Sequence, residues 1–122
     1  MLPNVNAEHN MNWQPLSEEL TLEKIQEDSF HQPQVIFKHS TRCPISATAK
    51  SRFERSFQDA YQEKMQFYLI DLITYRSVSN AVASKWNIQH ESPQVLVISD
   101  GQVRFHESHY GISWEGILSA LS

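Results

Sequence analysis

The stretch VIFKHSTRCPIS, residues 35–46, joins an apolar run to the start of a helix and holds the only cysteine of the sequence. Val35–Phe37 is short, apolar and preceded by Pro33, a pattern that predicts a buried strand. Pro44 fits the first position of a helix, where its missing N–H has no partner to lose. The stretch therefore predicts a strand followed by a helix, with Cys43 at their junction.

On either side of this junction, helical and strand-like patterns alternate. Apolar residues recur every four positions from Ile45 to Phe57, which gives the helix after Cys43 one apolar face. The predicted elements are, in order, a helix to about Ser29 capped by Ser17, a strand at 35–37, the helix that opens at Cys43, a strand at 65–72, a helix capped by Ser77 or Ser79 that ends at Asn87, a strand at 95–98, a returning strand through Val103 and Phe105, and a helix capped by Ser113.

The order of these elements predicts the fold class. A helix separates the first two strands, so they should run parallel, because a parallel pair needs a crossover connection. Asp100-Gly101 is a tight-turn signal, so the last two strands should form a hairpin. We therefore predict an α/β, thioredoxin-like fold over residues 13–122, with a four-stranded mixed sheet flanked by helices, after a flexible N-terminal extension over residues 1–12.

Composition limits the classes of function. The 122 residues carry a net charge of −4, which argues against a general nucleic-acid binder, because phosphate binding depends on an excess of Lys and Arg. No apolar run approaches the roughly 20 residues of a membrane span, and the N-terminus shows no secretory signal pattern. We expect a cytoplasmic protein with no nucleic-acid or membrane partner, whose cysteine is kept reduced.

Cys43 is the strongest candidate for chemistry. A lone cysteine can be inert packing, a metal ligand or a nucleophile. The start of a helix carries partial positive charge and unpartnered N–H groups, and both favour the thiolate, which is the nucleophilic form. Arg42 adds a positive charge next to it. In open α/β sheets, ligands also bind at junctions of this kind. The position therefore favours a nucleophile that attacks disulfides.

Ser46 lies three residues after Cys43, where dithiol oxidoreductases carry a second, resolving cysteine. Two roles for its hydroxyl stay open at this point. It can donate a hydrogen bond to the thiolate of Cys43, or, as a polar residue of the first helical turn, it can bond the backbone. In either case one sulfur acts alone, so a thiol from outside must release any mixed disulfide formed on Cys43.

The histidines raise the question of a metal site. His106 and His109 are close in sequence, yet no paired cysteines accompany them. A structural zinc site usually shows paired ligands at short spacing, so we predict no metal. His39 follows the first strand, and His90 lies beside Ser92-Pro93. His39 is expected to cap backbone groups, face solvent or help orient the active-site loop. His90 is expected to border the substrate groove or to lie in a solvated loop.

Five segments of the sequence carry a resemblance to a known family. They are FKHSTRCPIS at 37–46, RFE at 52–54, YLIDLITYRSVSN at 68–80, HESPQVLVI at 90–98 and GQVRFHESHYGI at 101–112. Together they resemble the YtxJ family, the monothiol bacilliredoxins, which are thioredoxin-fold proteins of bacillithiol metabolism. The resemblance covers the chain from about Trp13 onward.

The resemblance implies a reaction and a set of site residues. The cysteine of the family's C-P-I-S motif takes bacillithiol from a mixed disulfide on a client protein, and that role falls on Cys43. Cys43 and Ser46 are then the expected catalytic residues. Thioredoxin-fold proteins also resemble one another in a cis-proline that faces the reactive cysteine, a place that Pro93 occupies. The expected substrate-binding residues are Arg42, Pro44, Ile45, Ser92 and Pro93.

Three functions follow for comparison. The leading prediction is a monothiol disulfide reductase that binds no cofactor and uses bacillithiol or a similar low-molecular-weight thiol as co-substrate, with thiol-capped proteins as clients. The second is a carrier that holds an iron–sulfur cluster between two subunits, which needs further thiolates from a small thiol. The third is a thioredoxin-like adaptor whose cysteine has no catalytic role.

Overall fold

The central feature of the fold is a five-stranded mixed sheet, which a computed structural model describes over residues 11–122. The strands follow the order β1-β3-β2-β4-β5 across the sheet. Their bounds are Trp13–Pro15 for β1, Gln34–His39 for β2, Gln66–Asp71 for β3, Gln94–Ser99 for β4 and Gln102–Ser108 for β5. Of the predicted N-terminal extension, residues 1–10 lie outside the described residues, whereas Met11 is buried in the core.

The pairing of the strands confirms the predicted fold class. β2 runs parallel to β3, and β4 and β5 form an antiparallel hairpin. β2 also pairs antiparallel with β4, which makes the sheet mixed. The sheet has five strands rather than the predicted four, because the short segment Trp13–Pro15 adds to the outer edge of β3 in parallel.

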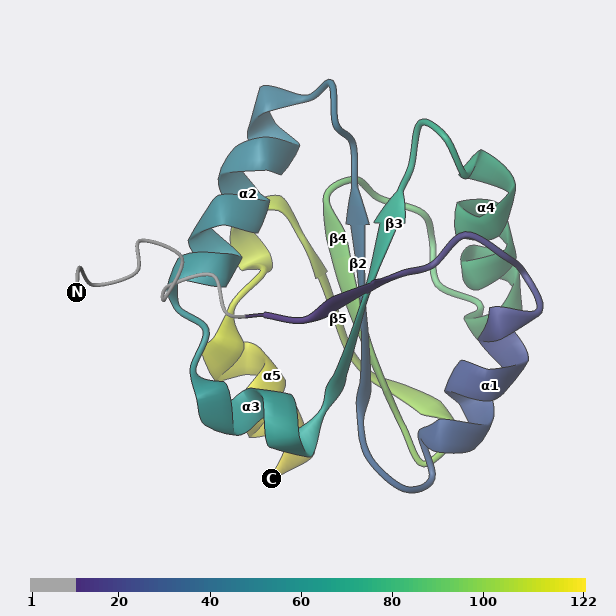
Figure 1. Cartoon of the computed structure of the whole chain (residues 1–122), viewed down its shortest axis with the longest axis vertical. Helices are drawn as coiled ribbons and strands as arrows, with labels where there is room; N and C mark the ends of the chain where they lie inside the picture. Colours follow the sequence, from purple (N-terminus) through teal and green to yellow (C-terminus); the bar gives the residue numbers. More distant parts are fainter. Residues whose placement is uncertain (1–10) are drawn as a thin grey trace.

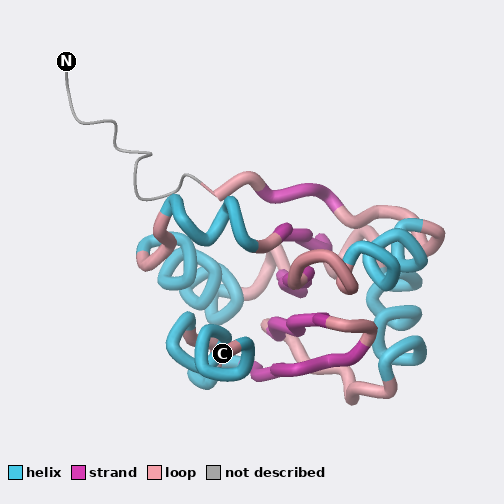
Figure 2. Tube along the Cα trace, turned by 90° about the horizontal axis from the view of Figure 1, so that it is seen from below, coloured by secondary structure: helices cyan, strands magenta, loops and turns pink. Residues whose placement is uncertain are grey.

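Helices cover both faces of this sheet (Figure 1). Seen from below, they form two layers with the strands between them (Figure 2). One layer holds α2, α3 and α5, and the other holds α1 and α4 (Figure 1). The bounds are Thr21–Asp28 for α1, Pro44–Arg55 for α2, Asp59–Lys64 for α3, Arg76–Trp86 for α4 and Trp114–Leu121 for α5, with a short 3-10 helix, η2, at His109–Gly111. Within residues 11–122, every helix is too short or too polar to cross a bilayer.

The two faces of the sheet bury different cores. Successive side chains of a strand point to opposite faces. Phe37 of β2 therefore joins an aromatic cluster that includes Phe53 and Trp114, under α2 and α5. Ile36 joins an aliphatic cluster with Val82, under α1 and α4. The same alternation sends the two residues that end β2, at positions 38 and 39, to opposite faces.

Several predicted boundaries need correction. The first helix begins at Thr21, and Leu20 precedes it, so Ser17 is not its cap. Tyr75 precedes α4, so neither Ser77 nor Ser79 caps that helix, although it does end before Asn87. The helix after Cys43 ends at Arg55, and a separate short helix, α3, follows it. The chain bends there because Phe57 turns into the aromatic core.

Candidate active site

Cys43 lies where β2 passes into α2, as predicted. It is half-buried, and it occupies the position before the first helical residue in an extended conformation, with φ −106° and ψ 117°. Its carbonyl accepts the first helical bond, from the N–H of Ala47 at 3.0 Å. Among the described residues no side chain caps this turn. The N–H groups of Ile45 and Ser46 therefore remain available to a group that approaches the helix start.

The hydroxyl of Ser46 is bonded within the loop that precedes the helix. Ser46 is fully buried. Its Oγ accepts the N–H of Ser40 at 3.0 Å and forms a 2.7 Å hydrogen bond with Nδ1 of His39. These bonds hold the loop from β2 to Cys43 against the first turn of α2. They fit the backbone-bonding role of Ser46, and a bond to the sulfur of Cys43 stays a prediction.

His39 supports this loop from the end of β2. Burial lowers the pKa of its imidazole, and the nearby charge of Lys50 lowers it further, while Asp71 and Glu54 act in the opposite direction. Lys50 is itself paired with Glu54 at 2.7 Å. A lowered pKa keeps His39 neutral at neutral pH. Its ring can therefore hydrogen-bond to the hydroxyl of Ser46 without placing a positive charge in the loop.

The second loop of the predicted site contains Ser92 and Pro93. The peptide bond between them is cis, as the resemblance implied. The carbonyl of Pro93 accepts the N–H of His109 at 3.2 Å. This hydrogen bond ties the loop to η2, the short helix that follows β5.

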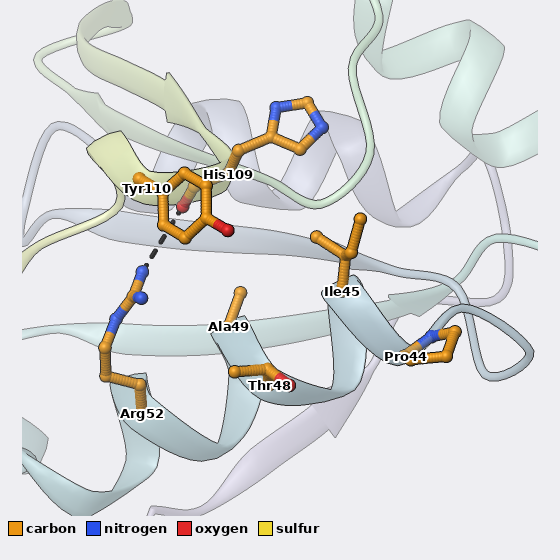
Figure 3. Close-up of a pocket in the computed structure, with 7 residues that line it drawn as sticks. All are labelled: Pro44, Ile45, Thr48, Ala49, Arg52, His109 and Tyr110. Atoms are coloured by element: carbon orange, nitrogen blue, oxygen red, sulfur yellow. Dashed lines mark hydrogen bonds between the residues drawn. The ribbon is translucent and has the colours of Figure 1, made fainter.

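A cavity of about 170 Å³ lies between α2 and η2 (Figure 3). Because Pro44 is one of its walls, the cavity begins one residue from Cys43. Arg52 extends from the third turn of α2 toward η2, and its Nη2 donates to the carbonyl of His109 at 3.3 Å. The remaining walls are formed by Ile45, Thr48, Ala49 and Tyr110.

The structure brings some of the predicted site residues together and leaves others apart. Pro44 and Ile45 share the cavity, and Pro93 is joined to it through His109. Ile45 follows Cys43 by two residues, and its side chain is 55% exposed. Arg42 is exposed and Ser92 half-buried, and neither makes a side-chain hydrogen bond or ion pair within residues 11–122.

Sequence reasoning missed three residues of this cavity. Arg52 entered the sequence analysis only within the segment RFE, although its spacing from Ile45 and Ala49 places it on the same helix face as those two residues. That spacing is the signal that could have identified it. His109 and Tyr110 come from a different element, and no local pattern connects them to Cys43.

A second polar cluster lies on the opposite face of the sheet. Lys38 is fully buried, and its ammonium donates to Nδ1 of His90 at 3.2 Å. The hydroxyl of Ser79 lies 3.4 Å from the same nitrogen. Burial lowers the pKa of Lys38 to about 8, and burial followed by the charge of Lys38 lowers the pKa of His90. The cluster anchors the loop before Ser92 to the end of β2.

Over residues 11–122, no three His, Cys, Asp or Glu side chains come together in a way that would hold a metal ion. His106 is exposed on β5, whereas His109 lines the cavity on η2. The two histidines therefore lie on different elements and do not form a pair. His39 and His90 bond to side chains on opposite faces of the sheet.

Comparison with known proteins identifies relatives of this arrangement. The family model for the monothiol bacilliredoxin BrxC matches residues 14–117, which is most of the chain. The match includes both loops of the site and the cavity between α2 and η2.

Comparison with solved structures also gives proteins of the thioredoxin fold. A protein described as having a thioredoxin fold is 29% identical, with a TM-score of 0.74, and the alignment covers 88% of this chain and 92% of that one. The thioredoxin Mala s 13 of Malassezia sympodialis is 15% identical, with a TM-score of 0.69 and coverage of 92% and 90%. Thioredoxin f of spinach chloroplasts, in its long form, is 12% identical, with a TM-score of 0.66 and coverage of 97% and 95%. The last two show the fold alone.

Proposed function

The chain belongs to the monothiol bacilliredoxin family, and from this membership we propose that it removes bacillithiol, or another low-molecular-weight thiol, from mixed disulfides on client proteins. Family and fold support a thiol–disulfide redox role. One observation carries the finer proposal. The only cysteine, Cys43, lies half-buried at a helix start with no side-chain cap, and a buried serine, Ser46, stands where a resolving cysteine would be.

The proposed step is an exchange in which one disulfide replaces another. The thiolate of Cys43 attacks the sulfur of the capping thiol. The bond between that sulfur and the client's sulfur breaks, and the electron pair leaves on the client as a thiolate. Cys43 then carries the thiol as a mixed disulfide, so the client cysteine is reduced and Cys43 is oxidised.

The helix start favours this step through electrostatics. The partial positive charge of the first turn stabilises the attacking thiolate, and the first-turn N–H groups of Ile45 and Ser46 have no side-chain cap to compete for them. Arg42 adds an exposed positive charge next to Cys43 in the sequence. Ile45, Pro44 and the loop that carries Ser92 and Pro93 serve as contacts for the client chain.

Release of the thiol requires a second molecule. The hydroxyl of Ser46 cannot attack a disulfide under these conditions, and it is bonded to Ser40 and His39. A second thiolate from solution attacks the mixed disulfide, forms a new disulfide with the capping thiol and returns Cys43 as a thiolate. We place this cycle in the cytoplasm, where a pool of reduced small thiols can supply the attacking group.

Intact-mass analysis tests the proposal. A client protein capped with bacillithiol is incubated with the reduced protein, and both masses are followed with time. We expect the client to lose the mass of bacillithiol and this protein to gain it on Cys43. Clients capped with glutathione or coenzyme A, run in parallel, identify the preferred thiol.

A matched variant and two readouts separate the competing functions. Cys43→Ser should leave the client capped. If the wild-type protein also leaves the client capped and Cys43 reacts with iodoacetamide no faster than free cysteine, the adaptor function is favoured. Visible absorption of protein isolated without oxygen would favour the iron–sulfur carrier.

A further inference from the structure

Arg52 closes the cavity beside Cys43 at its far end and has no acidic partner among the described residues. A guanidinium has five N–H donors. The side chain of Arg52 makes one described hydrogen bond, of 3.3 Å to the carbonyl of His109, and its Cζ lies 6.0 Å from the centre of the Tyr110 ring. Lys50 on the same helix is instead paired with Glu54 at 2.7 Å. Arg52 therefore keeps most of its donors and its charge for another group.

The shape of the cavity indicates how a ligand would lie in it. Ile45, Ala49 and Arg52 follow one another along one face of α2, and Figure 3 shows the guanidinium of Arg52 turned toward η2, to one side of Ala49. A helix rises about 1.5 Å per residue, so Cys43 and Arg52 are separated by roughly 13 Å along the axis. A molecule attached by its sulfur to Cys43 can therefore lie along the apolar wall with its other end at the guanidinium.

The chemistry of that end favours an anion. A half-buried guanidinium binds a carboxylate through two parallel N–H donors, which is a stronger interaction than a neutral hydrogen bond. An apolar ligand group in the same place would displace water from the guanidinium of Arg52 without supplying a negative charge, and leaving a charged group unpaired and out of water costs free energy. The cavity thus has an apolar wall for a short stem and a positively charged end for a carboxylate.

We propose that Arg52 binds a carboxylate of the low-molecular-weight thiol while that thiol is transferred to Cys43, and that its stem lies against Ile45 and Ala49. This inference rests on the proposed function, since it assigns the part of the cavity that selects the capping thiol. The wall on η2 completes the subsite, because the carbonyl of His109 fixes the orientation of the guanidinium. The cavity then distinguishes acidic thiols from neutral ones of equal length.

The test uses one client peptide capped with a series of ω-mercapto acids of increasing length, and with the matching amides. The second-order rate constant for transfer to Cys43 is measured by mass spectrometry. At the best length, the wild-type protein should take the acid about tenfold faster than the amide, the size expected for one charge-assisted interaction. Arg52→Gln should remove this preference, and Arg52→Lys should keep part of it.

Two controls make the result specific. Arg55→Gln removes an exposed charge from the same helix outside the cavity and should keep the preference for acids. The rate of alkylation of Cys43 by iodoacetamide should be equal in the wild type and Arg52→Gln, which shows that the substitution does not act on the sulfur. Equal loss of preference in the Arg52 and Arg55 variants would overturn the inference.

The failure of the inference differs from the failure of the proposed function. If the wild-type protein transfers acid and amide at the same rate, the carboxylate subsite is wrong and the exchange reaction stands. If it transfers neither thiol, although the peptide disulfide is intact, both proposals are wrong.

Discussion

The first turns of α2 and α5 follow similar backbone conformations and are completed in different ways. Cys43 and Ser113, the residues before them, are both extended. The hydroxyl of Ser113 accepts the N–H of Gly116 at 3.0 Å, and Glu115 places a negative charge in the first turn of α5. The first turn of α2 has neither a side-chain cap nor an acidic residue. One helix start is closed by its own side chains, and the other is open to a group from outside.

The two starts also differ in what they bury. Trp114 opens α5 inside the aromatic core, with its ring stacked 4.1 Å from that of Phe53 and its Nε1 donating to the carbonyl of Phe53 at 2.8 Å. Ile45, in the first turn of α2, is 55% exposed. The start of α5 therefore serves stability, and the start of α2 exposes apolar surface beside the reactive sulfur.

The largest change in stability is expected from a substitution in the first turn of α5. Trp114→Ala should lower the free energy of unfolding by about 3–5 kcal/mol, because it leaves a cavity under α2 and α5 and removes a buried hydrogen bond. Ile45→Ala should lower it by less than about 1 kcal/mol, because most of that side chain is already in water. Urea unfolding of both variants measures the difference.

These two variants should rank in reverse order in the transfer reaction. Under folding conditions Ile45→Ala should slow transfer from a capped client more than Trp114→Ala does. If Ile45→Ala proves as destabilising as Trp114→Ala, then Ile45 is a core residue and the contrast between the two helix starts is wrong.

The elements on which this contrast depends could be predicted from the sequence where one or two adjacent residues determine the local backbone conformation. Pro44 marks the start of α2, since its missing N–H suits only the first turn. Asp100-Gly101 forms the hairpin with φ values of 55° and 78°, the left-handed region that such a pair accepts. Ser113 was identified as a cap from its residue type and place alone.

What the sequence did not reveal depends on contacts between distant segments. β1 has three residues, one of them Pro15, and shows no alternation, so nothing local marks it as a strand. It is a strand because β3 offers an unpaired edge, far along the chain. The wall of the cavity on η2 was missed for the same reason, since His109 and Tyr110 lie opposite α2 only in the folded protein.

The segments that lead into the two helices differ in buried charge, and this gives a prediction on pH. Lys38, just before the loop to α2, is fully buried, and burial lowers its pKa from 10.5 to about 8. The segment Ser108–Ser113, which leads into α5, contains no lysine or arginine. Below pH 8 both the folded and the unfolded chain hold the proton of Lys38, and the folded state bears the cost of the buried charge.

Between pH 8 and 10.5 the unfolded chain holds more protons at Lys38 than the folded chain does. The free energy of unfolding should therefore rise with pH in this range, by about 2–3 kcal/mol from this group. Urea unfolding across the range measures the rise, and amide chemical shifts should change around β2 rather than at Ser113. Lys38→Met should remove the rise, whereas Lys64→Met, at an exposed site, should keep it. An unchanged slope in Lys38→Met would show that the amine is not the source.

The smallest change in stability is expected from substitutions of Cys43 and Ser113, the residues that precede the two helices. Cys43→Ser places at the start of α2 the residue type that closes α5, and its hydroxyl can accept a first-turn N–H. We expect this variant to be more stable than the wild type by up to about 1 kcal/mol, although it loses the transfer reaction. Ser113→Ala should lose about 1 kcal/mol and leave the alkylation rate of Cys43 unchanged. Thermal and urea unfolding together with the alkylation rate measure both.

The converse substitution makes this comparison decisive. Ser113→Cys places sulfur at the start of α5, where it should cap poorly, so its loss of stability should approach that of Ser113→Ala. If Cys43→Ser is instead less stable than the wild type, the sulfur of Cys43 already stabilises its own helix start. The first turn of α2 would then be closed like that of α5, and its N–H groups would not be free to stabilise the attacking thiolate.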